Sequence, residues 1–316
     1  MDSDLPDVHV QDPSFKVGLT RVGVKGVRKT VVQESEEGSR TILPACFDAF
    51  VDLKPAQRGV HMSRHNEVLN EIIERTLELK IADAEMLCSA IAKELLERHD
   101  GAERAEVVMR SDYTKPKSTP KSSIPVQEHY SLNANSVVWR EGSELKMRKR
   151  IGVSARGITV CPCGQELSKE WARKKLEKNG FNEEQVEFVL STVPVGSHNQ
   201  RSEGFLSIET WEDCRVEADD LIEVIESSMS FPVFEILKRE DEKHLILEAH
   251  SNPVFVEDCV RSMLKRVLEK YSGLPDDAVV VARQTNFESV HNHDAFAERC
   301  VSLGELREEA LGIEGG

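Results

Sequence analysis

Hydrophobic and polar residues alternate along the first part of the chain, and a period of two is typical of strands with one buried face. One alternating stretch covers residues 15–34, where Gly23 and Gly26 indicate a bend or a bulge. A second covers residues 41–53, and the turn-forming residues 36–39 lie between the two. The pattern therefore predicts a β-hairpin at the start of the fold.

Apolar residues then recur at three- and four-residue spacing, which predicts helices with one buried side. Leu87, Ile91 and Leu95 follow this spacing in the second of two expected helices. A later segment rich in Pro, Ser and Lys predicts a loop or a mobile flap. Together with the hairpin, the expected elements give a ββααββ outline: helices at 66–79 and 82–98, strands at 104–113, 126–140 and 145–160, and the flap at 115–125.

The second half of the chain has a similar but weaker pattern. Helical and alternating stretches again follow one another, which suggests an internal doubling of strands with paired helices. The expected elements are a helical insertion at 168–192, a strand at 204–216, a helix at 218–228, an extended segment at 234–249, a helix at 253–271, a strand at 278–284 and a helix at 303–311. These patterns divide the chain into a polar leader at 1–14, a first module at 15–160, a second module at 161–300 and a C-terminal tail at 301–316.

The charge balance restricts the class of partner. The 41 basic and 56 acidic residues give a net charge of −15, which repels phosphate backbones and makes nucleic acid an unexpected partner. No apolar run approaches the roughly 20 residues of a membrane helix, and the acidic N-terminus lacks the features of a signal peptide. We therefore expect a cytoplasmic protein without a membrane partner. The seven cysteines are odd in number and irregularly spaced, which argues against a disulfide framework.

Two short segments contain potential metal ligands. Cys161-Pro162-Cys163-Gly164 presents two thiols, and thiolates are strong ligands for zinc or ferrous iron. A C-x-C pair is weak by itself, because a buried cysteine pair explains it equally well. The segment His198 to Ser202 combines an imidazole, two amides and a guanidinium, although a polar surface loop would have a similar composition.

Two further segments add charged groups. Residues 237–243 and 256–258 are charge runs, which are usually solvated surfaces. The segment 286–293 contains Glu288 and His291, which are suited to metal or proton chemistry but also to an ordinary polar strand end. Taken together, the segments supply Cys, His and Glu side chains. Three such protein ligands with one open position are typical of a catalytic metal site rather than a structural one.

The order of these motifs resembles one known family. The motifs follow the order of the type IB GTP cyclohydrolases. They are GVHMSR at 59–64, CPC at 161–163, HNQRS at 198–202, LKR and DEK within 237–243, NP and FVED within 252–258, and NFESVHNH at 286–293. The longer separation of CPC from HNQRS resembles the archaeal branch, called type IV, a ferrous-dependent GTP cyclohydrolase of methanopterin synthesis. The resemblance implies an α+β tunnelling fold (T-fold), with two ββαα-type modules of antiparallel sheets that assemble into barrels on oligomerisation.

The resemblance also implies roles for individual residues. The metal, Fe²⁺ with Zn²⁺ or Mn²⁺ as alternatives, would be held by Cys161, His198 and Glu242. The groups expected around the reacting carbon and the metal are Cys163, Glu288 and His291, with His291 oriented by Glu288 as a proton shuttle. Glu257 would anchor guanine, because a carboxylate accepts two parallel hydrogen bonds from the ring N1–H and the exocyclic amine. The candidates for binding the triphosphate are Arg64, Arg201, Lys238, Arg239 and Lys243.

The implied reaction opens the guanine ring of GTP and releases C8 as formate. The archaeal product would be 7,8-dihydroneopterin 2′,3′-cyclic phosphate, formed with loss of diphosphate in the first step of tetrahydromethanopterin-type pterin synthesis. One alternative reaction ends at 7,8-dihydroneopterin triphosphate for folate or modified-nucleoside synthesis. Another alternative is a non-catalytic nucleotide-binding protein. The family also implies a homo-oligomer, either a dimer or a tetramer.

Overall fold

The structure is a computed structural model that describes all residues except 1–8, 10–11, 35–39, 77–82 and 313–316. The predicted turn at 36–39, most of the predicted leader and the end of the predicted helix at 66–79 lie outside the described residues. The chain divides into two compact units. Unit 1 comprises Met1–Tyr113, Ser131–Gly152 and Glu209–Val216, and unit 2 comprises Thr114–Tyr130, Val153–Ile208 and Glu217–Gly316.

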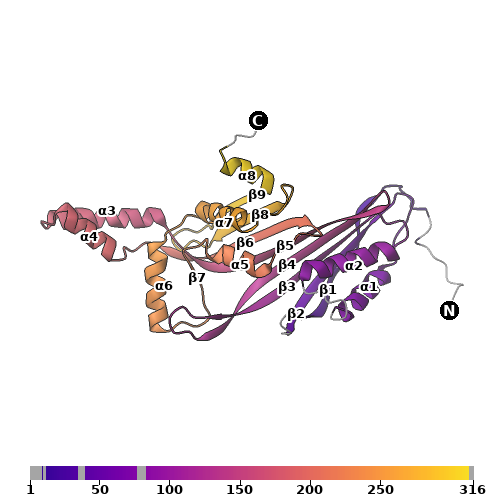
Figure 1. Cartoon of the computed structure of the whole chain (residues 1–316), viewed down its shortest axis with the longest axis horizontal. Coiled ribbons are helices and arrows are strands. Elements are labelled where there is room, and N and C mark those ends of the chain that lie inside the picture. Colours follow the sequence, from indigo (N-terminus) through magenta and orange to yellow (C-terminus); the bar gives the residue numbers. More distant parts are fainter. Residues whose placement is uncertain (1–8, 10–11, 35–39, 77–82, 313–316) are drawn as a thin grey trace. The chain divides into compact units, whose positions relative to one another are not determined.

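The described residues form nine strands and eight helices (Figure 1). The strands are β1 (Leu19–Glu34), β2 (Arg40–Leu53), β3 (Arg104–Ser118), β4 (Pro125–Glu141), β5 (Glu144–Val160), β6 (Asn199–Trp211), β7 (Phe231–Pro232), β8 (Val279–Asn286) and β9 (Ala295–Ser302). The helices are α1 (Met62–Glu74), α2 (Ala84–Arg98), α3 (Pro162–Lys178), α4 (Glu183–Thr192), α5 (Ala218–Glu226), α6 (Arg239–Ser251), α7 (Val256–Lys270) and α8 (Leu303–Ala310). The strands belong to one sheet in the order β1-β2-β3-β4-β5-β6-β8-β9, and β7 pairs with β5.

The predicted hairpin and bulge of unit 1 are confirmed. Strands β1 and β2 are antiparallel, and their register shifts between Val24 and Val27. Gly26 lies at the shift with a φ of +73°, a conformation that glycine adopts without steric cost. Its amide donates to the carboxylate of Asp48 at 2.8 Å, which satisfies the N–H that the bulge removes from the strand ladder.

The core of unit 1 lies between its strands and two helices. Phe47, Ala49 and Val51 alternate along β2 and are at most 1% exposed, because they face the helical layer. Helix α1 packs on α2 and β1, and α2 also contacts β2 (Figure 1). The apolar spacing of α2 is confirmed, since Leu87, Ile91 and Leu95 are all fully buried.

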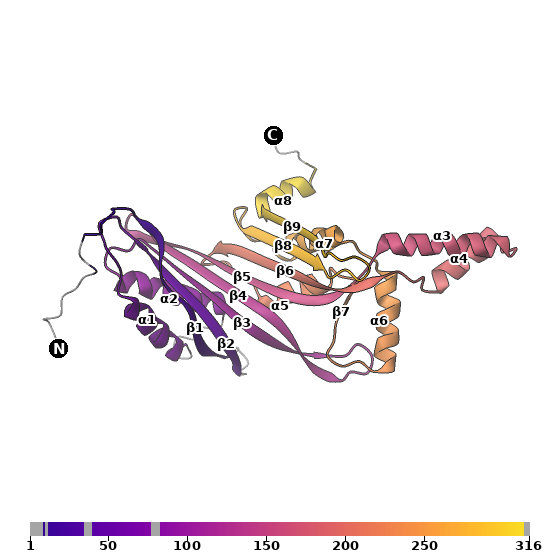
Figure 2. The same ribbon diagram turned by 180° about the vertical axis from the view of Figure 1, so that it is seen from behind.

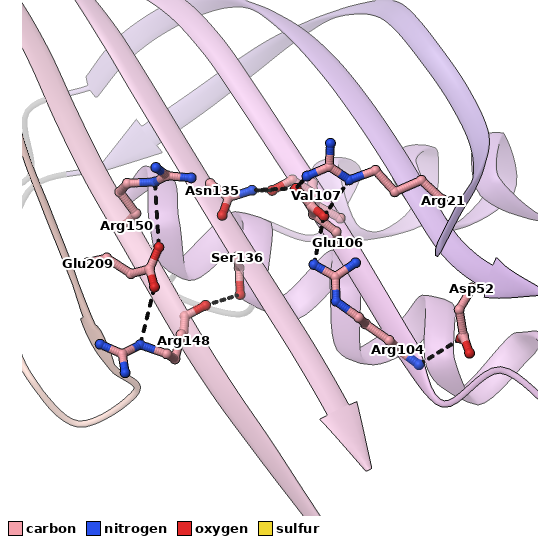
Figure 3. A network of polar contacts seen from close by, with 10 residues as sticks. All are labelled: Arg21, Asp52, Arg104, Glu106, Val107, Asn135, Ser136, Arg148, Arg150 and Glu209. Atoms are coloured by element: carbon pink, nitrogen blue, oxygen red, sulfur yellow. Dashed lines mark hydrogen bonds and ion pairs between the residues drawn. The ribbon is translucent and has the colours of Figure 1, made fainter. Parts of the chain in front are cut away.

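Another face of the unit 1 strands carries a network of charged and amide side chains (Figure 3). Glu106 is 3% exposed and accepts hydrogen bonds from Arg21 at 2.6 and 2.8 Å and from Arg104 at 2.9 Å. The amide of Asn135 also faces this carboxylate, at 3.4 Å. The buried charge is therefore neutralised by two guanidinium groups, as a buried carboxylate requires.

Unit 2 contains the C-terminal strands and the helices that cover them. Helix α7 packs on β8, β9 and α5, and α8 contacts both β9 and α7 (Figure 2). Helices α3 and α4 form a hairpin that turns at Asn179 and Gly180, and Asn182 caps α4 with a reciprocal capping box. This hairpin includes the segment that the sequence predicts to be a helical insertion.

The expected fold class is wrong. A tunnelling fold would contain two ββαα modules, whereas the described strands form a single nine-stranded sheet with eight helices around it. The second half also departs from the ββαα order, because α5 follows β6 and two helices separate β7 from β8. Local alternation predicts that a segment is a strand, but it does not specify which strand pairs with it.

Three local predictions also need correction, and one strand was missed. The segment expected to be extended at 234–249 contains most of α6, strand β9 was not predicted, and the strand expected at 204–216 begins earlier, at Asn199. The expected flap is partly a continuation of β3, which extends to Ser118. Within the described part of the chain, no helix combines the length and the apolar character needed to cross a membrane.

Candidate active site

Two of the three expected metal ligands, Cys161 and His198, meet where β5 ends. Cys161 follows β5 and caps α3, with Pro162 as the first helical residue. Its thiol accepts a hydrogen bond from the Gly164 amide at 3.4 Å. The Cys161 amide donates to the carbonyl of His198 at 3.1 Å, and the Ser197 hydroxyl donates to the Cys161 carbonyl at 2.7 Å. The CPC and HNQRS segments therefore form one local structure.

Gly164 permits this close approach. A Cβ atom at Gly164 would lie 2.6 Å from the Ser197 hydroxyl oxygen and 3.3 Å from Cδ2 of His198. Ser197 has little room to move, because its hydroxyl is bonded to the Cys161 carbonyl. Only glycine therefore fits between the first turn of α3 and the HNQRS segment.

Gly164→Ala should separate these two segments. We expect a destabilisation of about 1–3 kcal/mol, which is typical of overpacking in a closed space. Gly196→Ala is the matched control and should be tolerated, since a Cβ atom at Gly196 would extend into open space, with no other segment within 4 Å. Urea unfolding of both variants provides the measurement. Equal effects of the two substitutions would contradict the proposed close contact.

The imidazole of His198 faces two side chains through the same ring nitrogen. Nδ1 lies 3.2 Å from Oε1 of Gln200 and 3.8 Å from Oε2 of Glu288. Glu288 follows β8, and the amide of Phe287 donates to the carbonyl of Arg201 at 3.0 Å, which joins the last motif to HNQRS. The Glu288 side chain is 10% exposed, and its buried Oε2 has no hydrogen-bond partner among the described residues.

The histidines of the last motif are arranged differently from the expectation. His291 is exposed and its ring stacks on that of His293, with centroids 5.2 Å apart and planes at 12°. The contacts of the described residues place Glu288 beside His198 and include none between Glu288 and His291. The carboxylate of Glu288 thus lies nearer to the imidazole of His198, while its expected role toward His291 stays a prediction.

Asp241, which sequence reasoning did not single out, is the buried carboxylate of the DEK motif. It lies in the first turn of α6, is 0% exposed, and accepts hydrogen bonds from the amides of Lys121 and Ser122 and from the Ser122 hydroxyl. The amide of Lys238 donates to it as well, at 2.9 Å. Burial alone would raise the pKa of Asp241, but these hydrogen bonds outweigh burial and lower its pKa well below 3.8.

Glu242 lies in the same helical turn but is exposed. The other end of α6 approaches the CPC segment, since the buried Gln165 donates to the carbonyl of His250 at 2.6 Å. Eight residues separate Glu242 from that contact, which corresponds to about 12 Å along a helix. Among the contacts of the described residues, none joins Glu242 to Cys161 or His198.

The remaining expected site residues are on the surface or partly covered. Glu257 is exposed in the first turn of α7, where the positive end of the helix dipole favours a carboxylate. Cys163 is exposed in the first turn of α3. The exposed basic candidates of unit 2 are Arg201, Lys238, Arg239 and Lys243. Arg64 belongs to unit 1, is half-buried, and donates to the carbonyl of Arg98 at 2.9 Å.

The donor types at the Cys161–His198 junction fit a divalent metal ion. A thiol and an imidazole are the usual ligands of zinc and are also suited to iron. The unpartnered oxygen of Glu288 is a buried polar atom of the kind that a cation, or a group bound to one, would satisfy. No group of three or more His, Cys, Asp or Glu side chains in the described ranges is arranged to hold a metal. The chain thus brings together two of the three expected ligands.

The fold and the site first define a class of protein. The fold is similar to that of the crystal structure of uricase from Arthrobacter globiformis, with a TM-score of 0.51 and 9% identity over 90% of this chain and 94% of that chain. This similarity agrees with the single sheet described above. A thiol, an imidazole and a buried carboxylate gather on this fold at one strand-to-helix junction, and groups of these types can serve in nucleophilic, acid–base or metal-assisted catalysis.

Residues 5–297 match the family described as type I GTP cyclohydrolase folE2, and the chain belongs to this family of hydrolases. Proteins called GTP cyclohydrolase MptA are similar over nearly their whole length. The identity is 45% to the protein of Methanobrevibacter smithii, over 96% of this chain and 98% of that protein. The identity to the protein of Methanothermobacter thermautotrophicus is 46%, over 98% of this chain and 97% of that protein. The identity to the protein of Methanocaldococcus jannaschii is 42%, over 98% of this chain and 98% of that protein.

Proposed function

We propose that this chain converts GTP to 7,8-dihydroneopterin 2′,3′-cyclic phosphate, with release of formate and diphosphate, as the first step of tetrahydromethanopterin-type pterin synthesis. Membership of the GTP cyclohydrolase family and the similarity to the MptA proteins support the ring opening. The observation that carries the proposal is the junction of Cys161 with His198 beside the buried carboxylate of Glu288. The junction supplies thiol, imidazole and carboxylate groups where water must be activated for attack on a purine carbon.

The proposed metal site consists of Cys161, His198 and Glu242, and Fe²⁺ is the proposed ion, with Zn²⁺ or Mn²⁺ as alternatives. A divalent ion supplies Lewis acidity, which makes water a stronger nucleophile at neutral pH. Glu242 takes its role from the resemblance alone, because its described contacts join it to neither of the other two ligands. Its substitution is therefore a direct test of that assignment.

The other residues bind and orient the substrate. Glu257 accepts hydrogen bonds from N1–H and the exocyclic amine of guanine, and its exposed position in the first turn of α7 leaves the carboxylate accessible. Cys163 and His291 lie near the reacting carbon in the proposed complex. The proposed triphosphate ligands are Arg64, Arg201, Lys238, Arg239 and Lys243, which supply positive charge in a chain whose net charge is −15.

Removing a proposed metal ligand should abolish turnover. We expect Cys161→Ala, His198→Ala and Glu242→Ala each to lower formate release from GTP by about 100-fold or more, because several kcal/mol of transition-state stabilisation is lost. Cys300→Ala is the matched control, since Cys300 is an exposed cysteine of β9. Formate is measured after anaerobic reconstitution with Fe²⁺, Zn²⁺ or Mn²⁺ in turn. Full activity of Cys161→Ala would refute the role of Cys161 as a metal ligand. Full activity of Glu242→Ala would refute only the assignment of Glu242 as the third ligand.

Analysis of the phosphorus-containing product separates the proposed reaction from its main alternative. The cyclic phosphate forms when a ribose hydroxyl attacks the α-phosphate and expels diphosphate. Phosphorus NMR of the reaction should therefore show free diphosphate and a cyclic phosphodiester. A retained triphosphate would identify 7,8-dihydroneopterin triphosphate as the product. Binding of GTP without any formate would favour the non-catalytic alternative.

The proposal includes a homo-oligomer, either a dimer or a tetramer, and a cytoplasmic location. Both follow from the family resemblance and from the sequence composition. Light scattering of the purified protein measures the oligomeric state. A monomer that retains full activity would contradict the proposed homo-oligomer.

A further inference from the structure

We propose that Gln200 is a positioning residue that fixes His198 in the tautomer whose Nε2 binds the metal. This inference rests on the proposed function, because it assumes that His198 is a metal ligand. The resemblance assigned no role to Gln200. The local hydrogen bonds and the direction of the His198 ring carry the inference independently of the reaction.

The contact between the two side chains determines which ring nitrogen holds a proton. Gln200 is 7% exposed, and its Oε1 lies 3.2 Å from Nδ1 of His198. An amide oxygen only accepts hydrogen bonds, so Nδ1 must carry the hydrogen in this arrangement. In the neutral ring, Nε2 then has a free electron pair, which is the form that binds a metal.

The position of Glu288 disfavours the opposite arrangement. If the amide of Gln200 were turned over, its NH₂ group would donate to Nδ1 and the ring proton would lie on Nε2. The carboxylate oxygen Oε2 of Glu288 also faces Nδ1, at 3.8 Å, and it has no other partner among the described residues. A carboxylate oxygen at this position is a potential acceptor, so the geometry favours Nδ1–H and the orientation of Gln200 with its oxygen toward the ring. Carboxylates behind metal-binding histidines have this effect in other proteins.

Two buried hydroxyl groups hold the Gln200 amide in place. Nε2 of Gln200 donates to the hydroxyl oxygen of Thr159 at 2.9 Å. The Thr159 hydroxyl lies 2.7 Å from that of Ser202, and both residues are 0% exposed. Thr159 is on β5 and Ser202 on β6, which are neighbours in the sheet. The amide plane is thus fixed by the two strands rather than by a mobile loop.

The free edge of the His198 ring faces the helix that Cys161 caps. Cδ2, the atom bonded to Nε2, lies 3.3 Å from the position that a Cβ of Gly164 would occupy. Gly164 in turn donates its amide hydrogen to the thiol of Cys161. The Nδ1 edge therefore faces the positioning groups, and the edge that contains Nε2 lies toward the first turn of α3.

Metal affinity of the full-length apoprotein tests this inference without reference to turnover. We expect Gln200→Leu to bind Zn²⁺ or Co²⁺ about 10- to 100-fold more weakly in a chelator competition. Gln284→Leu is the matched control, because it makes the same exchange at a glutamine of β8 that is also 0% exposed. Gln200→Glu should keep the affinity within about fivefold, since a carboxylate also accepts from Nδ1–H. Equal affinity of Gln200→Leu and Gln284→Leu would overturn the inference, and so would a tenfold gain in Gln200→Glu.

A second measurement does not depend on the variants folding. Long-range proton–nitrogen NMR correlations of the apoprotein, labelled at histidine, distinguish Nδ1–H from Nε2–H for His198, and we expect Nδ1–H. The opposite tautomer would overturn the inference while the proposed function remained. If Cys161→Ala abolishes metal binding but Gln200→Leu does not, the metal site stands and only the role of Gln200 fails. If the parent apoprotein binds none of these metals, both proposals fail.

Discussion

Lowering the pH from 6.5 to 4 should reduce the free energy of unfolding of unit 1 by about 3 kcal/mol, because the folded chain holds His65 in its neutral form. His65 lies in α1, is 0% exposed, and its ring lies against that of His99. Burial, and then the nearby charge of His99, lowers the pKa of His65 from 6.5 to about 4.

The sign of the effect follows from proton binding. Between pH 6.5 and 4 the unfolded chain protonates this imidazole while the folded chain does not, so acid favours unfolding. The loss is absent above pH 6.5 and complete below about pH 4, and its size follows from about 1.4 kcal/mol per tenfold difference in proton affinity. Burial also lowers the pKa of His99, whose ring lies 4.4 Å from that of His65 between centroids, so His99 acts in the same direction. Arg64 adds positive charge near His99.

Urea unfolding at a series of pH values tests this prediction. Trp139 and Trp211 both belong to unit 1, with ring centroids 6.1 Å apart, so the Trp171→Phe background gives a fluorescence signal from this unit. His65→Leu should flatten the dependence of the free energy of unfolding on pH between pH 4 and 6.5. His129→Leu is the control and should not flatten it, because His129 is an exposed residue of unit 2. Unchanged slopes in His65→Leu would show that this imidazole is not the cause.

The pair of Asp48 and Arg110 in unit 1 acts in more acidic solution. Burial alone would raise the pKa of Asp48, but the hydrogen bonds from Arg110 and the Gly26 amide and the nearby charges of Arg110 and Lys25 together outweigh burial and hold the pKa of Asp48 below 3.8. The stability that this pair provides is therefore present above pH 4 and is lost only in stronger acid. Acid unfolding that began only below pH 4 would thus point to the carboxylates and contradict the role of His65.

Glu106→Ala should lower the free energy of unfolding of unit 1 by about 3 kcal/mol, which is the lower end of the usual range for breaking a buried ion pair. The substitution leaves the guanidinium groups of Arg21 and Arg104 without their shared carboxylate, and it leaves the amide of Asn135 with one acceptor fewer (Figure 3). Because the two arginine side chains are 56% and 32% exposed, water partly compensates them, so a larger loss is not expected.

An exposed ion pair of the same unit provides the control. Glu103 pairs with Lys54 at 2.8 Å, but the two side chains are 62% and 45% exposed. Exposed ion pairs of this kind contribute little to the free energy of unfolding, because water and salt screen the two charges. Glu103→Ala should therefore leave the urea midpoint nearly unchanged in the same Trp171→Phe background. Similar losses in Glu103→Ala and Glu106→Ala would show that burial does not govern the strength of the network.

The sequence predicted best where the signal is local. The hairpin of β1 and β2, with its bulge at Gly26, follows from alternation and from one glycine. The helix α2 follows from a regular four-residue spacing. Helix α6 was missed because Leu245, Ile246 and Leu247 form an apolar run that fits no single helical stripe, and two of these three side chains are exposed.

The candidate site was predictable in its residue types but not in its geometry. The thiol, imidazole and carboxylate groups are visible in short motifs, and the motif order indicates the family. Which carboxylate lies beside His198 was not predictable, and the structure places Glu288 there. Gln200 and Asp241 were missed because a buried amide or carboxylate inside a polar motif looks the same in sequence as an exposed one.

The sequence by itself determined the strand and helix tendencies, the chemistry of the motifs and the family, because these depend on neighbouring residues and on side-chain identity. The tertiary structure decided that the strands form one sheet, that His65 is buried beside His99, and that Cys161 meets His198. These features depend on packing and on hydrogen bonds between residues far apart in the chain. A local pattern contains no information on such distant contacts, since each segment would show the same periodicity against any partner of suitable shape.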